Sequence, residues 1–556
     1  MDDPQGMWRK LAQTRVSRRR VLSAAGLTAA AAAGATLAGC GRAAQTPSAT
    51  ATRVPRTGGT LRIGTAVPLT YGLDPQLERG SGLAIFPRVY GYLHHVDMQD
   101  GDAVLLDHAA NVEQPDAATL VFHLRPDVRF QDLAPVHGRA VAAQDVVASV
   151  LRYRDNPLVV EKLWHATVLD RIEALDAGTV RVVTRRPYVY SLQNLGDINA
   201  GAILPRELVD GHADLQTSGA GSGPFTIDRA DAVAQTWRIA RNAAYYRHPL
   251  PYLDAMQWQV FADDASKLAA FARTDLDQID NRDKPEAQAA QAANRGVVVD
   301  AEPSLAWLSL GLRLDAPPLA DARVRQALDL ALDRDALIRS IAPSAGTVLG
   351  PVNPHLAAGY WSLPEADVRA AFAGGTPTDQ RRTDARLLLA AAAAGSASIA
   401  LQTVNTPRMI DLAAAVREQL LRIGLDLRIE ELDALTWFVN FRKGAFQATL
   451  ISHPPYESPD LPTRLYHSGG IDGAGNMFAL RDPAIDALVE RSWGEADRAT
   501  RRHTLLAAQR LMLASRAMLQ LFTSAGYTST RDNVRDRRPD LIGSLAQYNY
   551  AQWLSA

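Results

Sequence analysis

Cysteine is almost absent from this chain, since Cys40 is the only one among 556 residues. A single thiol cannot close an internal disulfide or build a thiolate metal cluster, and we expect no cysteine nucleophile. The metalloprotease motif HExxH and the hydrolase motif GxSxG are also missing. We therefore expect no catalytic residues, no cofactor and no enzyme activity.

Other kinds of site lack their sequence signals too. The net charge is only −1, and no basic stripe interleaved with aromatic residues suggests a nucleic-acid partner. The glycine-rich segment 219–225 has neither phosphate-loop spacing, and no helix is expected after it. His94 and His95 are adjacent, so they do not share a face of a strand or helix, and we predict no metal site.

The N-terminus has the composition of an export signal. A basic segment that includes Arg18 and Arg19 precedes an apolar run rich in alanine, residues 21–38. This order is typical of a secretory signal peptide, which we place at residues 1–39. The run is also about long enough to span a bilayer, so an uncleaved anchor is the alternative, although its many Ala and Gly residues would make insertion weak.

Two short motifs refine this prediction. The segment around Arg18 and Arg19 resembles the twin-arginine export motif, and Leu37-Ala38-Gly39-Cys40 resembles the lipobox of bacterial lipoproteins. The resemblance implies that Cys40 carries lipid and that the protein is exported and anchored to a membrane, facing the periplasm or the cell exterior. Residues 40–59 are small, polar and Pro-dotted, which predicts a lipidated Cys followed by a flexible tether.

The rest of the chain alternates strands and helices. It exceeds the roughly 250–300 residues at which single cores stop growing, so more than one lobe is expected. Period-two alternation predicts strands at Thr60–Thr65 and Thr119–Leu124. Further strands are expected at Thr179–Thr184 and Ser398–Val404. A helix is predicted at Asp384–Gly395, with Gly395 as its C-cap. Such alternation is typical of an α/β fold with a substantially parallel sheet.

Residues 311–341 contain the most distinctive helix pattern. Pro317 and Pro318 prevent a helix before them, and Asp321 can then cap one. One continuous amphipathic helix is predicted, with its charged residues mostly off the apolar face. The residues of that face are Val324, Leu328, Ala331, Leu332, Ile338 and Ile341, and the charged residues are Arg323, Arg325, Asp329 and Arg334.

Several segments resemble one family in wording and in order. They include PPLADARVRQALDLALDRDALI at 317–338, RNAAYYRHPLPYLDAMQWQ at 241–259 and AAAVREQLLRIGLDLRIEELD at 413–433. The family is the extracellular solute-binding proteins of the peptide/nickel class, family 5, which feed ABC importers. The resemblance covers roughly residues 58–550.

The resemblance implies a two-lobed periplasmic-binding-protein-like α/β fold of type II, cluster C, with an extra subdomain in the first lobe. Lobe I is expected to combine residues 60–89, 217–303 and 527–556. The extra subdomain is expected at residues 90–216, and lobe II at residues 304–526. A ligand would lie in the cleft between the lobes, which closes on it by hinge motion.

The family's amine-binding acid would lie near residues 451–460, where this chain departs from the family pattern. Glu457 is the first candidate and Asp460 the second. Tyr456, His453 and the upstream Trp437 are candidates for the walls of the ligand pocket. The alternative for Glu457 and Asp460 is that they are solvated loop acids. The alternative for Tyr456, His453 and Trp437 is ordinary packing.

The function implied by the resemblance is the substrate-binding subunit of an ABC importer. It would be a monomer that captures a peptide or other small polar solute and delivers it to permease subunits in the membrane. Two alternatives stay open: a surface sensing or interaction lipoprotein on the same fold without a dedicated permease, and a hydrolase that uses a carboxylate pair in the cleft.

Overall fold

The computed structural model describes residues 55–66, 72–77, 82–97, 103–159, 162–211, 214–215, 218–231, 234–281, 283–342, 346–395, 397–454, 456, 458–471, 475–537 and 552–555. Cys40, Arg18 and Arg19 lie outside these residues, and so does Glu457. Residues Thr57–Ala556 form one unit of the structure. Among the helices of the described ranges, none is long and apolar enough to cross a membrane.

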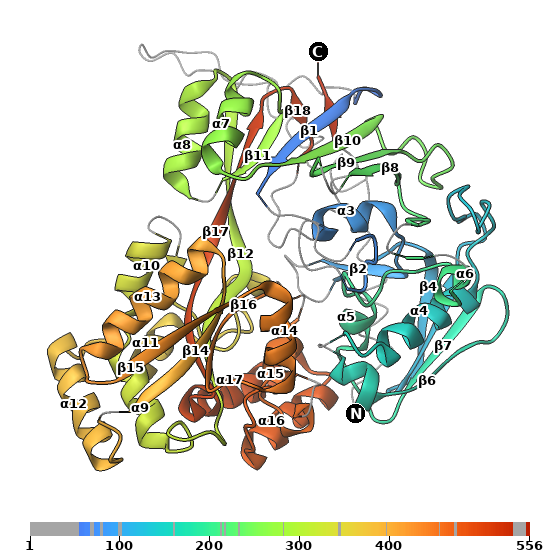
Figure 1. The fold of residues 1–556 in the computed structure, drawn as a ribbon. Helices are drawn as coiled ribbons and strands as arrows, with labels where there is room; N and C mark the ends of the chain where they lie inside the picture. Colours follow the sequence, from blue (N-terminus) through green and yellow to red (C-terminus); the bar gives the residue numbers. More distant parts are fainter. Residues whose placement is uncertain are drawn as a thin grey trace, which may run out of the picture. The chain divides into compact units, whose positions relative to one another are not determined.

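The largest sheet joins strands from both halves of the chain (Figure 1). Its order is β15-β14-β16-β12-β17-β11-β1-β10-β9-β8, and β13 also pairs with β17. The strands are β1 (Thr60–Thr65), β8 (Phe225–Asp231), β9 (Thr236–Arg241), β10 (Ala255–Val260), β11 (Gln278–Asn281), β12 (Val297–Leu312), β13 (Gly346–Thr347), β14 (Ser398–Val404), β15 (Asp426–Leu432), β16 (Ala448–His453) and β17 (Met518–Arg531).

The sheet is mixed, which corrects the prediction of a substantially parallel one. Parallel pairs join β1 to β10 and β11, and β14 to β15 and β16. The strands β12 and β17 are antiparallel to each other and to their other neighbours in the sheet. The alternation of helices and strands predicted the α/β class correctly but not the strands that return from the C-terminal half.

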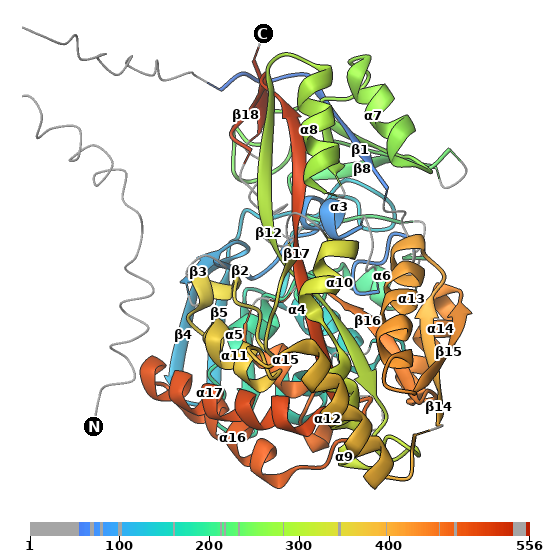
Figure 2. The ribbon, with the colours of Figure 1, turned by 90° about the vertical axis from the view of Figure 1, so that its left-hand side faces the viewer.

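Two long strands, β12 and β17, run side by side through both lobes (Figure 2). The first half of β12 pairs with the part of β17 that also binds β11, and its second half pairs with β16. The register between β12 and β17 shifts between Pro303 and Trp307. The ladder is therefore interrupted between the two lobes, where a bend costs the fewest hydrogen bonds.

Lobe I, as named here, contains β1 and β8–β11 with α3 (Gly82–Val89), α7 (Asp264–Ala272) and α8 (Lys284–Ala293). The subdomain is a separate antiparallel sheet in the order β4-β5-β7-β6. Its elements are β4 (Ala109–Asp116), β5 (Thr119–Leu124), β6 (Leu169–Ala174), β7 (Thr179–Thr184), α4 (Ala143–Asp155), the π-helix η1 (Trp164–Val168), α5 (Ser191–Leu195) and α6 (Arg206–Val209).

Two further strand pairs are β2 (His94–Asp97) with β3 (Ala103–Leu106) and β18 (Val534–Arg535) with β19 (Trp553–Leu554).

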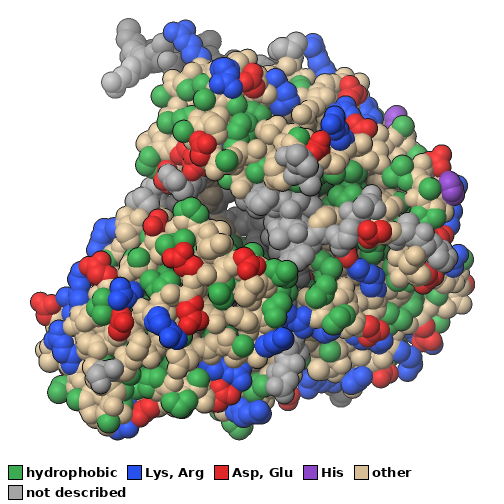
Figure 3. Space-filling view, viewed as in Figure 1, with side chains coloured by type: hydrophobic (Ala, Val, Ile, Leu, Met, Phe, Trp, Pro, Cys, Tyr) green, Lys and Arg blue, Asp and Glu red, His purple; other side chains and the backbone are tan. Residues whose placement is uncertain are grey.

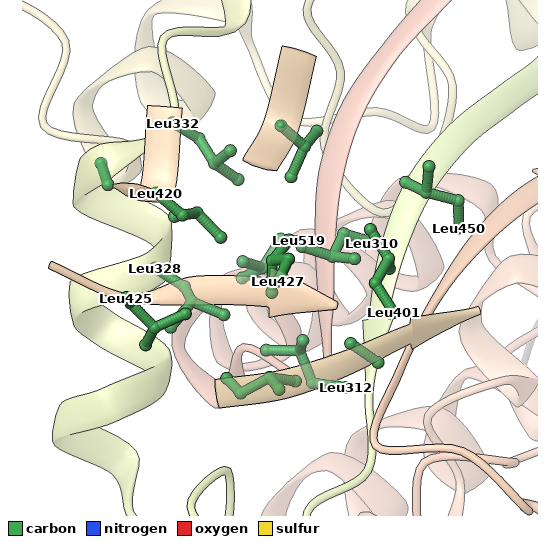
Figure 4. Close-up of a cluster of buried hydrophobic side chains, with 14 of the residues drawn as sticks. Leu310, Leu312, Leu328, Leu332, Leu401, Leu420, Leu425, Leu427, Leu450 and Leu519 are labelled. Carbon is green, nitrogen blue, oxygen red and sulfur yellow. The ribbon is translucent and has the colours of Figure 1, made fainter. Parts of the chain in front are cut away.

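Lobe II surrounds β14–β16 and the adjoining halves of β12 and β17 with helices. These are α9 (Ala322–Ala331), α10 (Arg334–Ile341), η2 (Leu356–Gly359), α11 (Glu365–Ala371), α12 (Thr378–Ala391), α13 (Pro407–Leu421), α14 (Ala434–Lys443), α15 (Asp460–Arg464), η3 (Ser468–Gly470), α16 (Pro483–Gly494) and α17 (Arg498–Ser515). Leucines from helices and strands meet in its core (Figure 4), among them Leu310, Leu328, Leu401, Leu420, Leu427 and Leu519.

The predicted helix of residues 322–341 is two helices, α9 and α10. The Asp321 side chain caps α9 as predicted, accepting a hydrogen bond from the Arg323 amide over 2.8 Å. Leu332 then leaves the helical conformation with ψ of 117°, and Asp333 caps α10 by accepting from the Ala336 amide. The single-helix prediction is wrong because an aspartate inside an amphipathic pattern resembles its polar face although it starts a new helix.

Two charged residues of this segment are buried, contrary to the prediction that they lie off the packed face. Asp329 and Arg334 are 4% and 5% exposed and form an ion pair of 2.6 Å. Arg516 approaches the other carboxylate oxygen to 3.1 Å, and Arg334 also donates to the Gln520 carbonyl. The pair joins α9 and α10 to the start of β17.

The four predicted strands match β1, β5, β7 and β14 residue for residue. The helix predicted at Asp384–Gly395 begins earlier, at Thr378, and ends at Ala391. Ala392 occupies the C-cap position, so the prediction of Gly395 as the cap is wrong.

Candidate functional site

The region predicted to hold ligand begins where β16 ends, beside the crossing strand β12. His453 is opposite Trp307 in the ladder, and the two rings stack with centroids 4.0 Å apart and planes at 6°. The Nε2 atom of His453 is hydrogen bonded to the Ser309 hydroxyl at 2.8 Å. Burial lowers the pKa of His453 to about 3, because the charged form would lose its hydration. The imidazole is therefore neutral at physiological pH.

Tyr456 packs on the same tryptophan from another direction. Its ring meets Trp307 edge-on, with centroids 5.1 Å apart and an interplanar angle of 85°. Its hydroxyl accepts a hydrogen bond of 2.5 Å from the Asn353 amide, and the Asn353 side chain donates to the Ser304 carbonyl. Burial raises the pKa of Tyr456, so the phenol stays protonated. Tyr456 thus joins the segment before η2 to the point where β12 crosses between the lobes.

Asp460 begins α15 and is fully buried. Its carboxylate accepts hydrogen bonds from the Tyr188 hydroxyl (2.7 Å), the Asn194 side chain (3.1 Å) and the Trp493 indole (2.9 Å). The Arg464 Nε atom lies 3.3 Å from Oδ2. Tyr188 and Asn194 belong to the subdomain, whereas Trp493 and Arg464 belong to lobe II. The carboxylate therefore joins the subdomain to lobe II.

The remaining predicted wall residue, Trp437, lies on α14 and is half-buried. Its indole donates to the Thr449 hydroxyl of β16 over 3.0 Å, and its ring stacks on Phe441 with centroids 5.2 Å apart. His453 and Tyr456 are brought together around Trp307, while Trp437 packs farther back along β16 and Asp460 faces the subdomain. The roles of these residues toward a ligand stay predictions, and Glu457 lies outside the described residues.

A pocket opens between the subdomain and lobe II, next to these residues. Its interior holds only about 20 Å³, room for one small polar group, and it is partly open to solvent. The subdomain lines it with Tyr153, His165, Gln193, Asn194, Asp197 and Ala200, and lobe II lines it with Tyr456, Ser458, Leu461 and Arg464. A separate hollow is visible in the space-filling view between the upper part of the molecule and lobe II (Figure 3).

Sequence reasoning missed several residues of this region. Trp307 could have been found from the sequence, because it is a large aromatic residue just before the segment 317–338 that resembles the family. His165 and Arg464 carried no such signal, because nothing near them in sequence shows that the pocket brings them together. Among the described residues, no group of three or more His, Cys, Asp or Glu side chains has the arrangement of a metal site.

Comparisons with known proteins place this geometry in context. A family model described as bacterial extracellular solute-binding proteins, family 5, middle region, matches residues 106–476. The glutathione-binding protein GsiB of Salmonella typhi is 25% identical over 326 residues, which cover 57% of this chain and 59% of that relative. The chain thus matches less than two thirds of the length of this curated relative.

Solved structures share the fold at low sequence identity. The periplasmic binding protein DppA of Helicobacter pylori, in complex with the peptide STSA, superposes with a TM-score of 0.78 at 19% identity, covering 90% of this chain and 99% of that one. The oligopeptide-binding protein AppA of Bacillus subtilis, in complex with a nonapeptide, gives 0.75 at 18% identity, with coverages of 90% and 100%. The fold is the two-lobed one of periplasmic binding proteins, as predicted.

Proposed function

Because this chain belongs to the bacterial extracellular solute-binding proteins of family 5, we propose that it is the substrate-binding subunit of an ABC importer. It captures a peptide or other small polar solute between its lobes and delivers it to permease subunits in the membrane. The observation that carries the proposal is the family match over residues 106–476, together with a fold in which two strands connect two lobes.

Hinge closure follows from the way β12 and β17 cross. The Thr523 hydroxyl of β17 lies 2.8 Å from both the Ser304 and the Ala306 carbonyls of β12, where the strand register shifts. Few ladder bonds have to change at this point, so the lobes can rotate about it. The proposal keeps the lobe boundaries at 303/304 and 526/527, with the subdomain at 90–216.

The ligand lies beside His453 and Tyr456 in this proposal, with Trp437 farther along the same wall. Both rings pack on Trp307 of a crossing strand, so contact with a ligand there reaches the hinge directly. Glu457 is the proposed partner of a ligand ammonium group. Asp460 is the weaker candidate, because three protein donors and Arg464 already surround its carboxylate. A peptide or other small polar solute fits this mixture of aromatic surface and hydrogen-bonding groups.

Export and anchoring complete the proposal. The motif around Arg18 and Arg19 directs export, and Cys40 carries the lipid that keeps a monomeric protein beside its permease. Two or more acyl chains give stable anchoring. In this proposal the tether joins Cys40 to the folded unit, which begins at Thr57. The Gly58 and Gly59 amides bond Tyr252 and Asp254, so the last residues of the expected tether belong to lobe I.

Mass spectrometry of small molecules that co-purify with residues 41–556 tests the proposal, followed by thermal unfolding of the stripped protein with those molecules added back. Ligand at about 100-fold its dissociation constant is expected to add about 2.7 kcal/mol to the free energy of unfolding. Recovery of the ligand unchanged after long incubation separates binding from hydrolysis. Absence of any stabilising molecule among co-purified compounds, peptides, metal chelates and sugars would contradict the proposal.

A further inference from the structure

The pocket between the subdomain and lobe II contains a histidine whose hydrogen-bonding groups are unused. His165 is 2% exposed, and neither of its ring nitrogens has a hydrogen-bond partner in the structure. Its ring packs against Tyr153 and Trp164, with centroids 4.7 and 4.8 Å away, which holds the imidazole in place. A buried polar group without a partner costs stability unless something else supplies the bond.

Two features of the surroundings keep His165 neutral. Burial lowers its pKa to about 3, and the positive charges of Arg464 and Arg154 act in the same direction. A neutral imidazole has one N–H donor and one acceptor nitrogen. The group opposite it must therefore accept one hydrogen bond or donate one, and a group that does both suits either tautomer.

A second pocket residue has the same deficit. Gln193 is 8% exposed, and its Oε1 atom is buried without a hydrogen-bond partner. It lies on α5, on the subdomain wall that also carries His165. A carboxamide oxygen only accepts, so it needs a donor in the pocket.

Charged ligand groups match this pocket poorly. An ammonium group would find Asp460 already bonded to three donors, and Asp197 Oδ1 accepts from the Asn199 and Ala200 amides. A carboxylate would find Arg464 beside Asp460, and it would meet the acceptor oxygen of Gln193. A neutral group that both donates and accepts satisfies His165 and Gln193 without desolvating a charge.

We propose that the pocket between His165, Gln193 and Arg464 is a ligand subsite that binds a neutral hydroxyl or carboxamide group. The inference rests on the proposed function, because it assigns part of the solute to this subsite. Its two walls belong to different parts of the fold, so a group bound there contacts both and stabilises their apposition. The subsite therefore reports on lobe closure as well as on ligand identity.

The test uses the mature chain and pairs of probes that differ in one group. Tripeptides of alanine with one Ser or Gln at each position are compared by calorimetry with all-Ala peptides and peptides with Met in place of Gln. D-Mannitol and 1-deoxymannitol are compared in the same way. This second comparison shows whether the preferred hydroxyl belongs to a peptide side chain or to a polyol. We expect at least one hydroxyl or carboxamide probe to bind about tenfold or more tightly than its partner, because the partner leaves the buried groups of His165 and Gln193 without hydrogen bonds.

The variants assign that preference to the subsite. His165→Leu and Gln193→Met are expected to remove the difference between paired probes, and His165→Gln to retain it, because a carboxamide can still donate and accept. His123→Leu, at an exposed position on β5 of the same subdomain, is the matched control and is expected to leave it unchanged. Circular dichroism shows which variants fold. If His165→Leu does not fold, Gln193→Met alone tests the assignment.

Three results would overturn the inference. The paired probes would bind the wild-type protein equally, or the preference would survive in both folded variants, or a crystal structure with a bound probe would contain only water between His165 and Gln193. In each of these cases the proposed function stands, because the probes still bind. If no probe binds and no ligand co-purifies, the proposed function itself fails and the subsite fails with it.

Discussion

The Tyr188 hydroxyl donates a 2.7 Å hydrogen bond to the Asp460 carboxylate, across 272 residues of sequence. Tyr188 follows the subdomain sheet, and Asp460 begins a helix of lobe II. The Tyr188 ring also packs on Trp493, with centroids 5.3 Å apart, and the Val189 amide donates to the Trp493 carbonyl. Asp460 is therefore the centre of a buried contact between two parts of the fold.

Removing the Asp460 charge should destabilise the fold strongly. In Asp460→Asn the amide group would face the donors of Tyr188, Asn194 and Trp493, and Arg464 would lose its counter-ion. Breaking a buried pair in this way costs about 3–5 kcal/mol. Tyr188→Phe removes one hydrogen bond and is expected to cost about 1 kcal/mol. Urea unfolding measures both, and equal effects of the two substitutions would refute this role of Asp460.

The ion pair at the start of lobe II gives a second stability prediction. Asp329→Ala leaves Arg334 buried without its carboxylate partner and is expected to cost about 3 kcal/mol or more. Arg323→Ala, on the same helix, removes an exposed pair with Asp321 and should cost far less than Asp329→Ala. Neither should change ligand affinity. A large loss of affinity in a folded Asp329→Ala protein would contradict this structural role.

Stability should rise with pH between about 3 and 6.5, in part through His453. Burial lowers the pKa of this histidine to about 3, against an ordinary value of 6.5. In that window the unfolded chain binds a proton that the folded one does not, so stability is complete above pH 6.5 and falls as the pH decreases. The contribution lost at pH 4.5 is about 3 kcal/mol.

The variant His453→Gln isolates this contribution, because its amide can still bond the Ser309 hydroxyl but does not titrate. Urea unfolding at pH 7.0 and 4.5 should show a smaller loss of stability in the variant than in the wild-type protein. His123→Gln, at an exposed position, is the control. An unchanged pH dependence in His453→Gln would show that this histidine already titrates normally.

Membrane attachment should depend on Cys40 alone among the residues of the tether. Cys40→Ser is expected to abolish incorporation of labelled fatty acid and to release the protein from the membrane fraction, without changing ligand affinity. Ser48→Ala is the control within the tether. Membrane association that persists in Cys40→Ser would instead favour the uncleaved apolar run at residues 21–38 as the anchor.

The sequence predicted local elements better than long-range contacts. The strand β5 was predicted residue for residue because its alternating apolar side chains reflect a half-buried sheet directly. The break at Leu332 was missed because Asp333 fits the polar face of one helix as well as it caps another. The burial of Asp329 and Arg334 was missed because charged side chains are usually exposed, and Arg516, which completes their cluster, is far along the chain.

The candidate site was predictable only in part, because its residues come from segments far apart in the sequence. The resemblance directed attention to residues 451–460, and His453, Tyr456 and Asp460 are all buried there. It did not indicate that Asp460 bonds the subdomain, because a single sequence carries no information about Tyr188 and Asn194 as partners. Nor did it indicate His165, whose unpaired ring nitrogens are visible only once the pocket is formed.

Small-angle X-ray scattering of the mature chain, before and after saturation with its co-purified ligand, tests the central claim most directly. Closure about β12 and β17 predicts a smaller radius of gyration in the liganded protein, together with higher thermal stability at the same ligand concentration. A radius of gyration and a melting temperature that stay unchanged with every co-purified or added solute would contradict the claim that this protein captures a solute between its lobes.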